Sequence, residues 1–118
     1  MGNTTTNCYG KIIISEEVIS ILTGIAATEC YGIVGMASKR LKDGIWELLR
    51  VENFSKGVTV KTSEDTLIVD IYIIVSYGVK ISEVAQNVMG KIKYNLETYM
   101  GLQVDEVNVN VQGIRVKE

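Results

Sequence analysis

The chain has 118 residues, of which 47% are hydrophobic, and its formal net charge at pH 7 is −2. This length and composition predict one folded domain that buries about two-thirds of its unfolded surface, and they exclude a disordered chain. The nearly balanced charge excludes a global basic field that would attract nucleic acid. No run of about 18 apolar residues occurs, so the sequence predicts no membrane span.

The chain opens with a polar tail, residues 1–9, which we expect to be flexible and to precede a single domain over residues 10–118. The tail lacks the basic and apolar regions of a secretory signal peptide. Two cysteines, Cys8 and Cys30, are too few for a disulfide scaffold. We therefore expect free thiols in a reducing cytoplasm.

A short strand, Lys11–Ile14, and an amphipathic helix, Glu16–Tyr31, are predicted next. Ser15 is a suitable N-cap, because its side-chain oxygen can accept from a free backbone N–H, and Gly32 is a suitable end. We expect this helix to pack on a sheet through apolar residues at helical spacing, which are Val18, Ile21, Leu22, Ile25 and Ala26.

The connection after this helix carries two glycines, Gly32 and Gly35, around an apolar pair. A short helix, Gly44–Arg50, is predicted further on, and it contains Trp46. Two interpretations of this short helix stay open. It closes one end of the core, as large apolar residues usually do, or Trp46 anchors a docked partner, because tryptophan is enriched at binding hot spots. A small basic cluster lies between these two features: Lys39, Arg40 and Lys42.

A β-hairpin within Gly57–Gly78 is the feature around which the other elements are expected to be arranged. Its first strand alternates apolar and polar residues from Val58, and the polar run Thr62–Thr66 suits a turn. One face of the second strand is predicted to be core: Leu67, Val69, Ile71, Ile73, Val75 and Tyr77. Its other face is mixed: Ile68, Asp70, Tyr72, Ile74 and Ser76.

The mixed face contains three apolar side chains, Ile68, Tyr72 and Ile74, and is a candidate interaction surface. Either a partner chain or another segment covers it in part, or these are ordinary scattered surface residues. We predict self-association through this face or through a sheet edge, since edge strands readily pair with another chain. Asp70 in the middle of the face opposes this, because an unpaired buried carboxylate is costly, unless a lysine across a two-fold axis matches it.

The most strongly periodic helix is Ile81–Met100, and Gly101 suits its end. A last strand follows, and its alternation of apolar and polar residues changes phase across Gly113. This change predicts a β-bulge in which Gly113 has a positive φ. The bulge would keep Val107–Val111 and Ile114–Val116 on the core face. A strand–helix–strand unit favours a parallel pair. The predicted fold class is therefore α+β: a two-layer sandwich with a mixed, mostly antiparallel sheet and the helices on one face. The stripe of the long helix is Ile81, Val84, Ala85, Val88, Ile92, Leu96 and Tyr99.

Groups for catalysis are scarce in this sequence. It has no histidine, the usual general base and metal ligand, and no phosphate-binding, dinucleotide-binding or nucleophile-elbow pattern. Asp65 and Asp70 are the nearest pair of carboxylates, and strand alternation points both away from the predicted core. The sequence therefore predicts no catalytic residue, no metal site and no cofactor, and we expect a protein that is not an enzyme.

RNA binding is an alternative hypothesis for the segment Gly32–Gly35. KH domains clamp nucleotide backbones with a GxxG loop that usually contains a basic residue. Here the middle residues are apolar and cannot neutralise phosphate, so the charge would come from Lys39, Arg40 and Lys42 downstream. A simple connection after a helix explains the glycines equally well, and we consider nucleic acid the less favoured partner.

Six spaced stretches cover about residues 10–116 and together carry a family resemblance. They are Gly10-Lys11-Ile12 with the following helix, Ile33–Met36, Lys56–Val60, Val69–Gly78, Ile81–Ala85, and Gly101-Leu102 followed by Val107–Val111. The set resembles the alkaline-shock-protein family, the envelope stress response proteins of Gram-positive bacteria, and within it the small YloU-like branch. Ser82 departs from the pattern, because relatives commonly place proline there, and this alters the helix cap rather than the fold.

The resemblance implies a cytoplasmic bacterial protein with no established enzymatic activity and no agreed active site. Some relatives gather beneath the membrane by binding a membrane-anchored partner, some self-associate, and others are encoded beside a fatty-acid kinase-like protein. We therefore predict a non-enzymatic cytoplasmic scaffold that acts through self-association or through a membrane-anchored or kinase-like partner, without inserting into the membrane. The candidate interaction residues are Trp46, Ile68, Tyr72 and Ile74.

Overall fold

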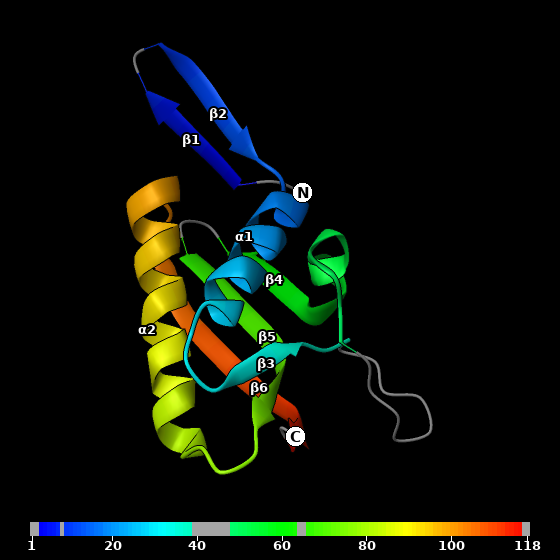
Figure 1. Ribbon diagram of the computed structural model, residues 1–118. Helices are drawn as coiled ribbons and strands as arrows, with labels where there is room; N and C mark the ends of the chain where they lie inside the picture. The colour runs from blue at the N-terminus through cyan, green and yellow to red at the C-terminus, as the bar shows by residue number, and fades with distance from the viewer. Residues whose placement is uncertain (1–2, 8, 39–47, 64–65, 117–118) are drawn as a thin grey trace.

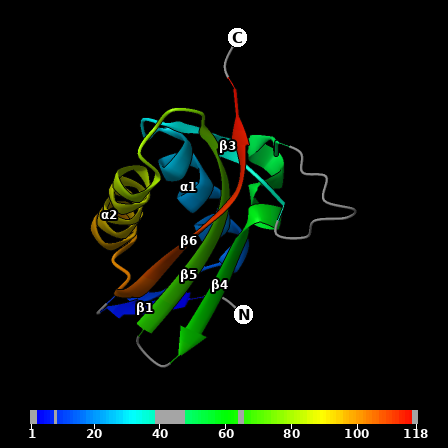
Figure 2. The same ribbon diagram turned by 90° about the horizontal axis from the view of Figure 1, so that it is seen from below.

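The computed structural model describes residues 3–7, 9–38, 48–63 and 66–116. The chain folds into two layers, with the helices α1 (Glu16–Thr28) and α2 (Ile81–Met100) packed on one face of a four-stranded sheet (Figure 1, Figure 2). This arrangement confirms the predicted α+β class.

The strand β5 (Thr66–Ser76) is the centre of the sheet. The strand β4 (Val58–Ser63) pairs antiparallel with the first half of β5, and β3 (Ile33–Met36) pairs antiparallel with its second half. Because β6 (Val104–Arg115) runs parallel along nearly all of β5, the strands β3 and β4 share its opposite edge. The predicted hairpin and the predicted parallel pair joined by a helix are both confirmed.

The core lies between this sheet and the two helices. On β5 the predicted core face is confirmed from Leu67 to Val75, where every side chain on that face is at most 2% exposed. Tyr77 lies beyond the strand and is exposed, so its assignment to the core is wrong. The centre of the predicted stripe on α2 is confirmed, whereas Tyr99 near its end is 75% exposed. The buried residues of α2 are Val84, Val88, Ile92 and Leu96.

The prediction for the core face of α1 is confirmed only in part, since Ala26 is 1% exposed and Ile25 packs against the core. Val18 and Leu22 were expected to be core, yet they are 46% and 43% exposed. Small side chains face inward instead, because Gly24 lets the ring of Phe54 approach the helix axis closely. The helix also ends at Thr28, with Glu29 as its C-cap, and not at Gly32 as expected. The buried residues of α1 are Ile19, Ser20, Thr23, Gly24, Ala26 and Ala27.

The expected flexible tail contains a strand. The strands β1 (Asn3–Asn7) and β2 (Gly10–Ile14) form an antiparallel hairpin, which projects from the body of the protein (Figure 1). The strand Lys11–Ile14 predicted from the sequence is thus confirmed as part of β2. The polar composition of the tail suggested flexibility, but its β-branched threonines also fit a strand.

The segment after β3 returns beside that strand. Ala37 forms an isolated antiparallel bridge with Leu48, and the backbone N–H of Leu49 donates to the carbonyl oxygen of Met36 at 2.8 Å. In this extended pairing, backbone groups of Leu48 and Leu49 face the segment at β3 and are not bonded within a helix. The prediction of a helix over Gly44–Arg50 is therefore wrong at its C-terminal end. The rest of the predicted helix, with Trp46, lies outside the described residues. A 3₁₀ helix, η1 (Val51–Gly57), then leads into β4.

The predicted bulge near the end of β6 is confirmed. Val111 pairs with Ile73 and Gly113 pairs with Ile74, so Gln112 is the extra residue. Gly113 does not have a positive φ, and that part of the prediction is wrong. Among the described residues, the glycines with positive φ are Gly32, Gly78 and Gly101. The expected burial after the bulge is also wrong, because two side chains are largely exposed, Ile114 and Val116.

Ser15 caps α1 as its sequence position predicts. Its Oγ accepts a hydrogen bond from the backbone N–H of Val18 at 3.2 Å. We expect Ser15→Ala to lower the free energy of unfolding by about 1 kcal/mol, because that N–H loses its partner. Ser15→Asn should keep most of the stability, since asparagine caps equally well. Urea denaturation of both variants tests the cap, and equal losses in the two would contradict it.

Candidate interaction surfaces

The mixed face of β5 is covered in part by the chain itself. Ile74 is 0% exposed, whereas Ile68 and Tyr72 are half-buried. Ile74 pairs with Gly35 on β3, and directly paired residues point to the same side of a sheet. A Cβ placed on Gly35 would lie 2.9 Å from Cδ2 of Leu48, so the Leu48 side chain covers this face. Ile74 is therefore not available as an interaction residue, and that prediction is corrected.

Besides Ile68 and Tyr72, this sheet face carries polar side chains that are bonded to one another or to the backbone. The Asn108 side-chain amide donates to the Asp70 carboxylate at 2.7 Å and to the Glu106 carboxylate at 3.2 Å. The Asn110 amide donates to the carbonyl oxygen of Ile71 at 3.1 Å. The Asp70 carboxylate thus has a neutral partner on the neighbouring strand and needs no lysine from another copy.

The two glycines of the RNA hypothesis do not form a loop between helices. Gly32 has φ +87° and precedes β3, and Gly35 lies inside that strand, buried and paired with Ile74. A buried glycine in a paired strand cannot clamp a nucleotide backbone, so this part of the hypothesis is wrong. The basic residues that it also needs lie outside the described residues; they are Lys39, Arg40 and Lys42.

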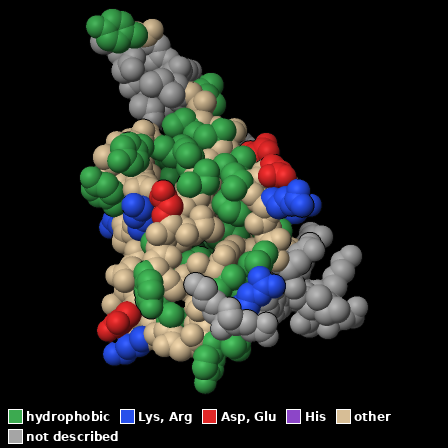
Figure 3. Space-filling model, in the orientation of Figure 1, with side chains coloured by type: hydrophobic (Ala, Val, Ile, Leu, Met, Phe, Trp, Pro, Cys, Tyr) green, Lys and Arg blue, Asp and Glu red, His purple; other side chains and the backbone are tan. Residues whose placement is uncertain are grey.

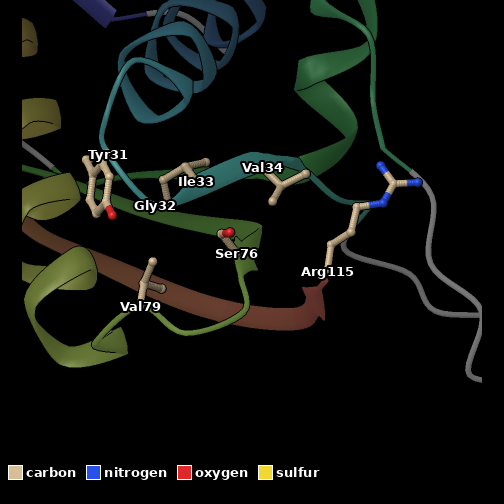
Figure 4. A pocket seen from close by; sticks show the side chains of 7 residues that line it. All are labelled: Tyr31, Gly32, Ile33, Val34, Ser76, Val79 and Arg115. Atoms are coloured by element: carbon tan, nitrogen blue, oxygen red, sulfur yellow. The ribbon is translucent and has the colours of Figure 1, made fainter. Parts of the chain in front are cut away.

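A cavity of about 440 Å³ lies where β3 begins and β6 ends (Figure 4). Its wall is largely apolar, and the Arg115 side chain lies at one end of the view. Among the seven described lining residues none carries a carboxylate, thiol or imidazole for acid–base chemistry. They are Tyr31, Gly32, Ile33, Val34, Ser76, Val79 and Arg115.

An apolar groove lies between α1 and α2, and we call it the interhelical groove. It encloses about 170 Å³, and hydrophobic side chains gather over this side of the molecule (Figure 3). Sequence reasoning missed the groove because it assigned Leu22 and Tyr99 to the core. The helical spacing of the apolar residues is the signal for this groove that the sequence contains. Only the packing of the two helices shows that Leu22 and Tyr99 stay exposed. The lining is uncharged: Leu22, Ile25, Ala26, Asn95, Leu96, Tyr99 and Met100.

Cys30 lies just beyond α1 and is half-buried as a free thiol. Its Sγ donates to the carbonyl oxygen of Ala26 at 3.5 Å. Burial raises the pKa of the Cys30 thiol above its ordinary value, although the nearby charge of Lys91 opposes this. A raised pKa leaves less thiolate at neutral pH, which makes Cys30 less reactive than an exposed cysteine.

The geometry defines a small two-layer α+β domain with an apolar groove between its two helices. Residues 4–116 match the model of the alkaline-shock-protein family, whose description gives a "cell envelope-related function". The chain belongs to this family, which confirms the resemblance inferred from its sequence.

The relatives are bacterial proteins of similar or greater length. The chain is 59% identical over 109 residues to "Uncharacterized protein YloU" of Bacillus subtilis, covering 92% of this chain and 91% of that protein. It is 51% identical over 108 residues to "Uncharacterized protein Spy1614" of Streptococcus pyogenes, covering 91% and 89%. A "Stress response regulator gls24 homolog" of S. pyogenes is 26% identical over 117 residues, covering 97% of this chain and 64% of that protein. No solved structure matches the chain. No helix among the described residues is long and apolar enough to cross a membrane.

Proposed function

We propose that this protein is a non-enzymatic interaction protein of the cell-envelope stress response, which acts in the cytoplasm by binding another protein chain. The observation that carries the proposal is the exposed apolar surface around the interhelical groove. An amphipathic helix usually turns its large apolar side chains to the core, yet α1 leaves Val18 and Leu22 nearly half exposed. Exposed apolar surface beside a groove is typical of a protein-binding site.

The family and its relatives support this setting. The family description states a cell envelope-related function, and one relative is named a stress response regulator homologue. The partner classes that we propose are a second copy of this chain, a membrane-anchored protein and a kinase-like protein. The sheet face is the weaker candidate, because Ile74 is buried and Asp70 is already bonded to Asn108.

Site-specific photocrosslinking in living cells tests this proposal. A photoreactive residue replaces Leu22 in the groove or, as the matched control, Lys61 on the exposed opposite side of the sheet. We expect position 22, and not position 61, to give a defined protein adduct, because the apolar groove contacts the partner. The partner protein in this adduct is identified by mass spectrometry and purified. It should bind the Val18→Lys variant at least about tenfold more weakly than the wild type.

Two results would overturn the proposal. One is the same set of adducts at positions 22 and 61, because the groove would then have no selective partner. The other is salt-sensitive, submicromolar binding to mixed RNA oligomers that a Lys39/Arg40/Lys42 triple alanine variant loses, which would make the protein an RNA-binding module.

A further inference from the structure

The hairpin of β1 and β2 packs little against the described helices and strands of its own chain. Asn3–Asn7 and Gly10–Ile14 pair in register, but within the described residues no other helix or strand packs extensively on them. The hairpin extends away from both helices (Figure 1). A two-stranded hairpin is marginally stable in water by itself and requires a further strand or a helix against it. The described residues of its own chain do not supply such a surface.

The interhelical groove offers a surface of the required kind. Leu22 and Tyr99 line the groove and are 43% and 75% exposed, so the groove is apolar and accessible. On the hairpin, Ile13 is 69% exposed and Tyr9 is 94% exposed, so the hairpin also presents apolar side chains to water. Both surfaces would lose exposed apolar area by meeting each other.

We infer that two copies of this chain exchange their N-terminal hairpins, so that the hairpin of each copy lies in the interhelical groove of the other. The inference rests on the proposed function, since it uses the same groove and names a second copy as its occupant. A two-fold axis produces both contacts at once. A five-residue strand spans about 17 Å, which is enough to lie along about three turns of a helix.

The size and charge of the two surfaces fit this exchange. Each copy would contribute the hairpin and the groove lining, roughly 20 residues, which is near the 20–30 residues per side of a standard interface. The groove lining is uncharged, and the hairpin sequence contains a single charged residue, Lys11. The exchange therefore buries no unpaired carboxylate.

The outer edge of β6 is a less suitable site for self-association. Within the described residues β6 pairs only with β5, which leaves its other edge open. Bulges at Asp105 and Gln112 distort this strand near both of its ends, and bulges of this kind discourage pairing with another chain. The open edge thus offers only a short regular stretch.

Light scattering after size exclusion, over about a hundredfold range of concentration, tests the exchange on the full chain. We expect the wild type to dimerise, and we expect Leu22→Lys and Ile13→Lys each to weaken the dimer at least about tenfold, because each places a charge in an apolar contact. Both side chains are exposed in the single chain, so neither change disturbs the core. Tyr72→Lys on the sheet face is the matched control and should leave the dimer intact.

Disulfide trapping provides a second test that does not depend on affinity. In a variant with Cys8→Ser and Cys30→Ser, the pair Ile13→Cys and Tyr99→Cys should oxidise to a covalent dimer. The yield of this dimer should be far higher than with either single cysteine. A bridged monomer would overturn the inference, because the hairpin would then lie on its own groove. A wild type that stays monomeric, or a dimer that only Tyr72→Lys disrupts, would also overturn it. In those cases a crosslink from position 22 to a different protein would still support the proposed function. The exchange of hairpins and the proposed function can therefore fail independently.

Discussion

Replacing Ile74 by alanine is expected to lower the free energy of unfolding by about 2–5 kcal/mol, although Ile74 lies on the face of the sheet opposite the helices. The side chain is 0% exposed, and Leu48 covers the same face beside it, over Gly35. Removing its methyl groups leaves a cavity that a β-strand paired on both edges can close only in part. The loss of unfolding free energy therefore arises within a single chain and should not change with protein concentration.

Urea denaturation at two concentrations about tenfold apart measures both the loss and its independence of concentration. Tyr72→Ala is the matched control on the same face, and it should cost clearly less because Tyr72 is only half-buried. If Ile74→Ala costs no more than Tyr72→Ala, the side chain is not buried by its own chain. If the loss grows on dilution, Ile74 contributes to an interface between copies instead.

Gly24→Ala should destabilise the protein although alanine is the better helix former. A Cβ at this position would lie 2.5 Å from Cδ2, 2.8 Å from Cγ and 2.9 Å from Cβ of the buried Phe54. Overpacking of this kind costs about 1–3 kcal/mol, and the helical gain of about 1 kcal/mol offsets only part of it. We expect the midpoint of thermal unfolding to fall, with the helix content of the folded protein unchanged in circular dichroism.

Gly90→Ala is the matched control, since it makes the same change inside the other helix. Nothing lies within 4 Å of a Cβ at Gly90, and its φ is not positive, so the variant should gain about 1 kcal/mol of stability. The two alanine variants are thus expected to shift the melting temperature in opposite directions. Shifts of the same sign would mean that Phe54 does not pack on Gly24.

The elements with a strong local period were predictable from the sequence. The second strand of the hairpin alternates without a break, and α2 carries an apolar residue at each turn of its buried face. Local chemistry also placed the cap at Ser15 and the bulge before Gly113, because both depend on neighbours along the chain. The order of strand, helix and strand was enough to predict the parallel pair of β5 and β6.

The sequence alone could not decide which apolar side chains would be buried, because burial depends on segments that are distant along the chain. In α1, apolar residues occur on more than one face, and the contact of Phe54 with Gly24 selects the face that turns inward. On the far side of the sheet, Leu48 lies over Gly35, which pairs with the buried Ile74. The same packing leaves Leu22 exposed, so the tertiary structure, through steric fit between distant residues, created the interhelical groove from residues that the sequence assigned to the core.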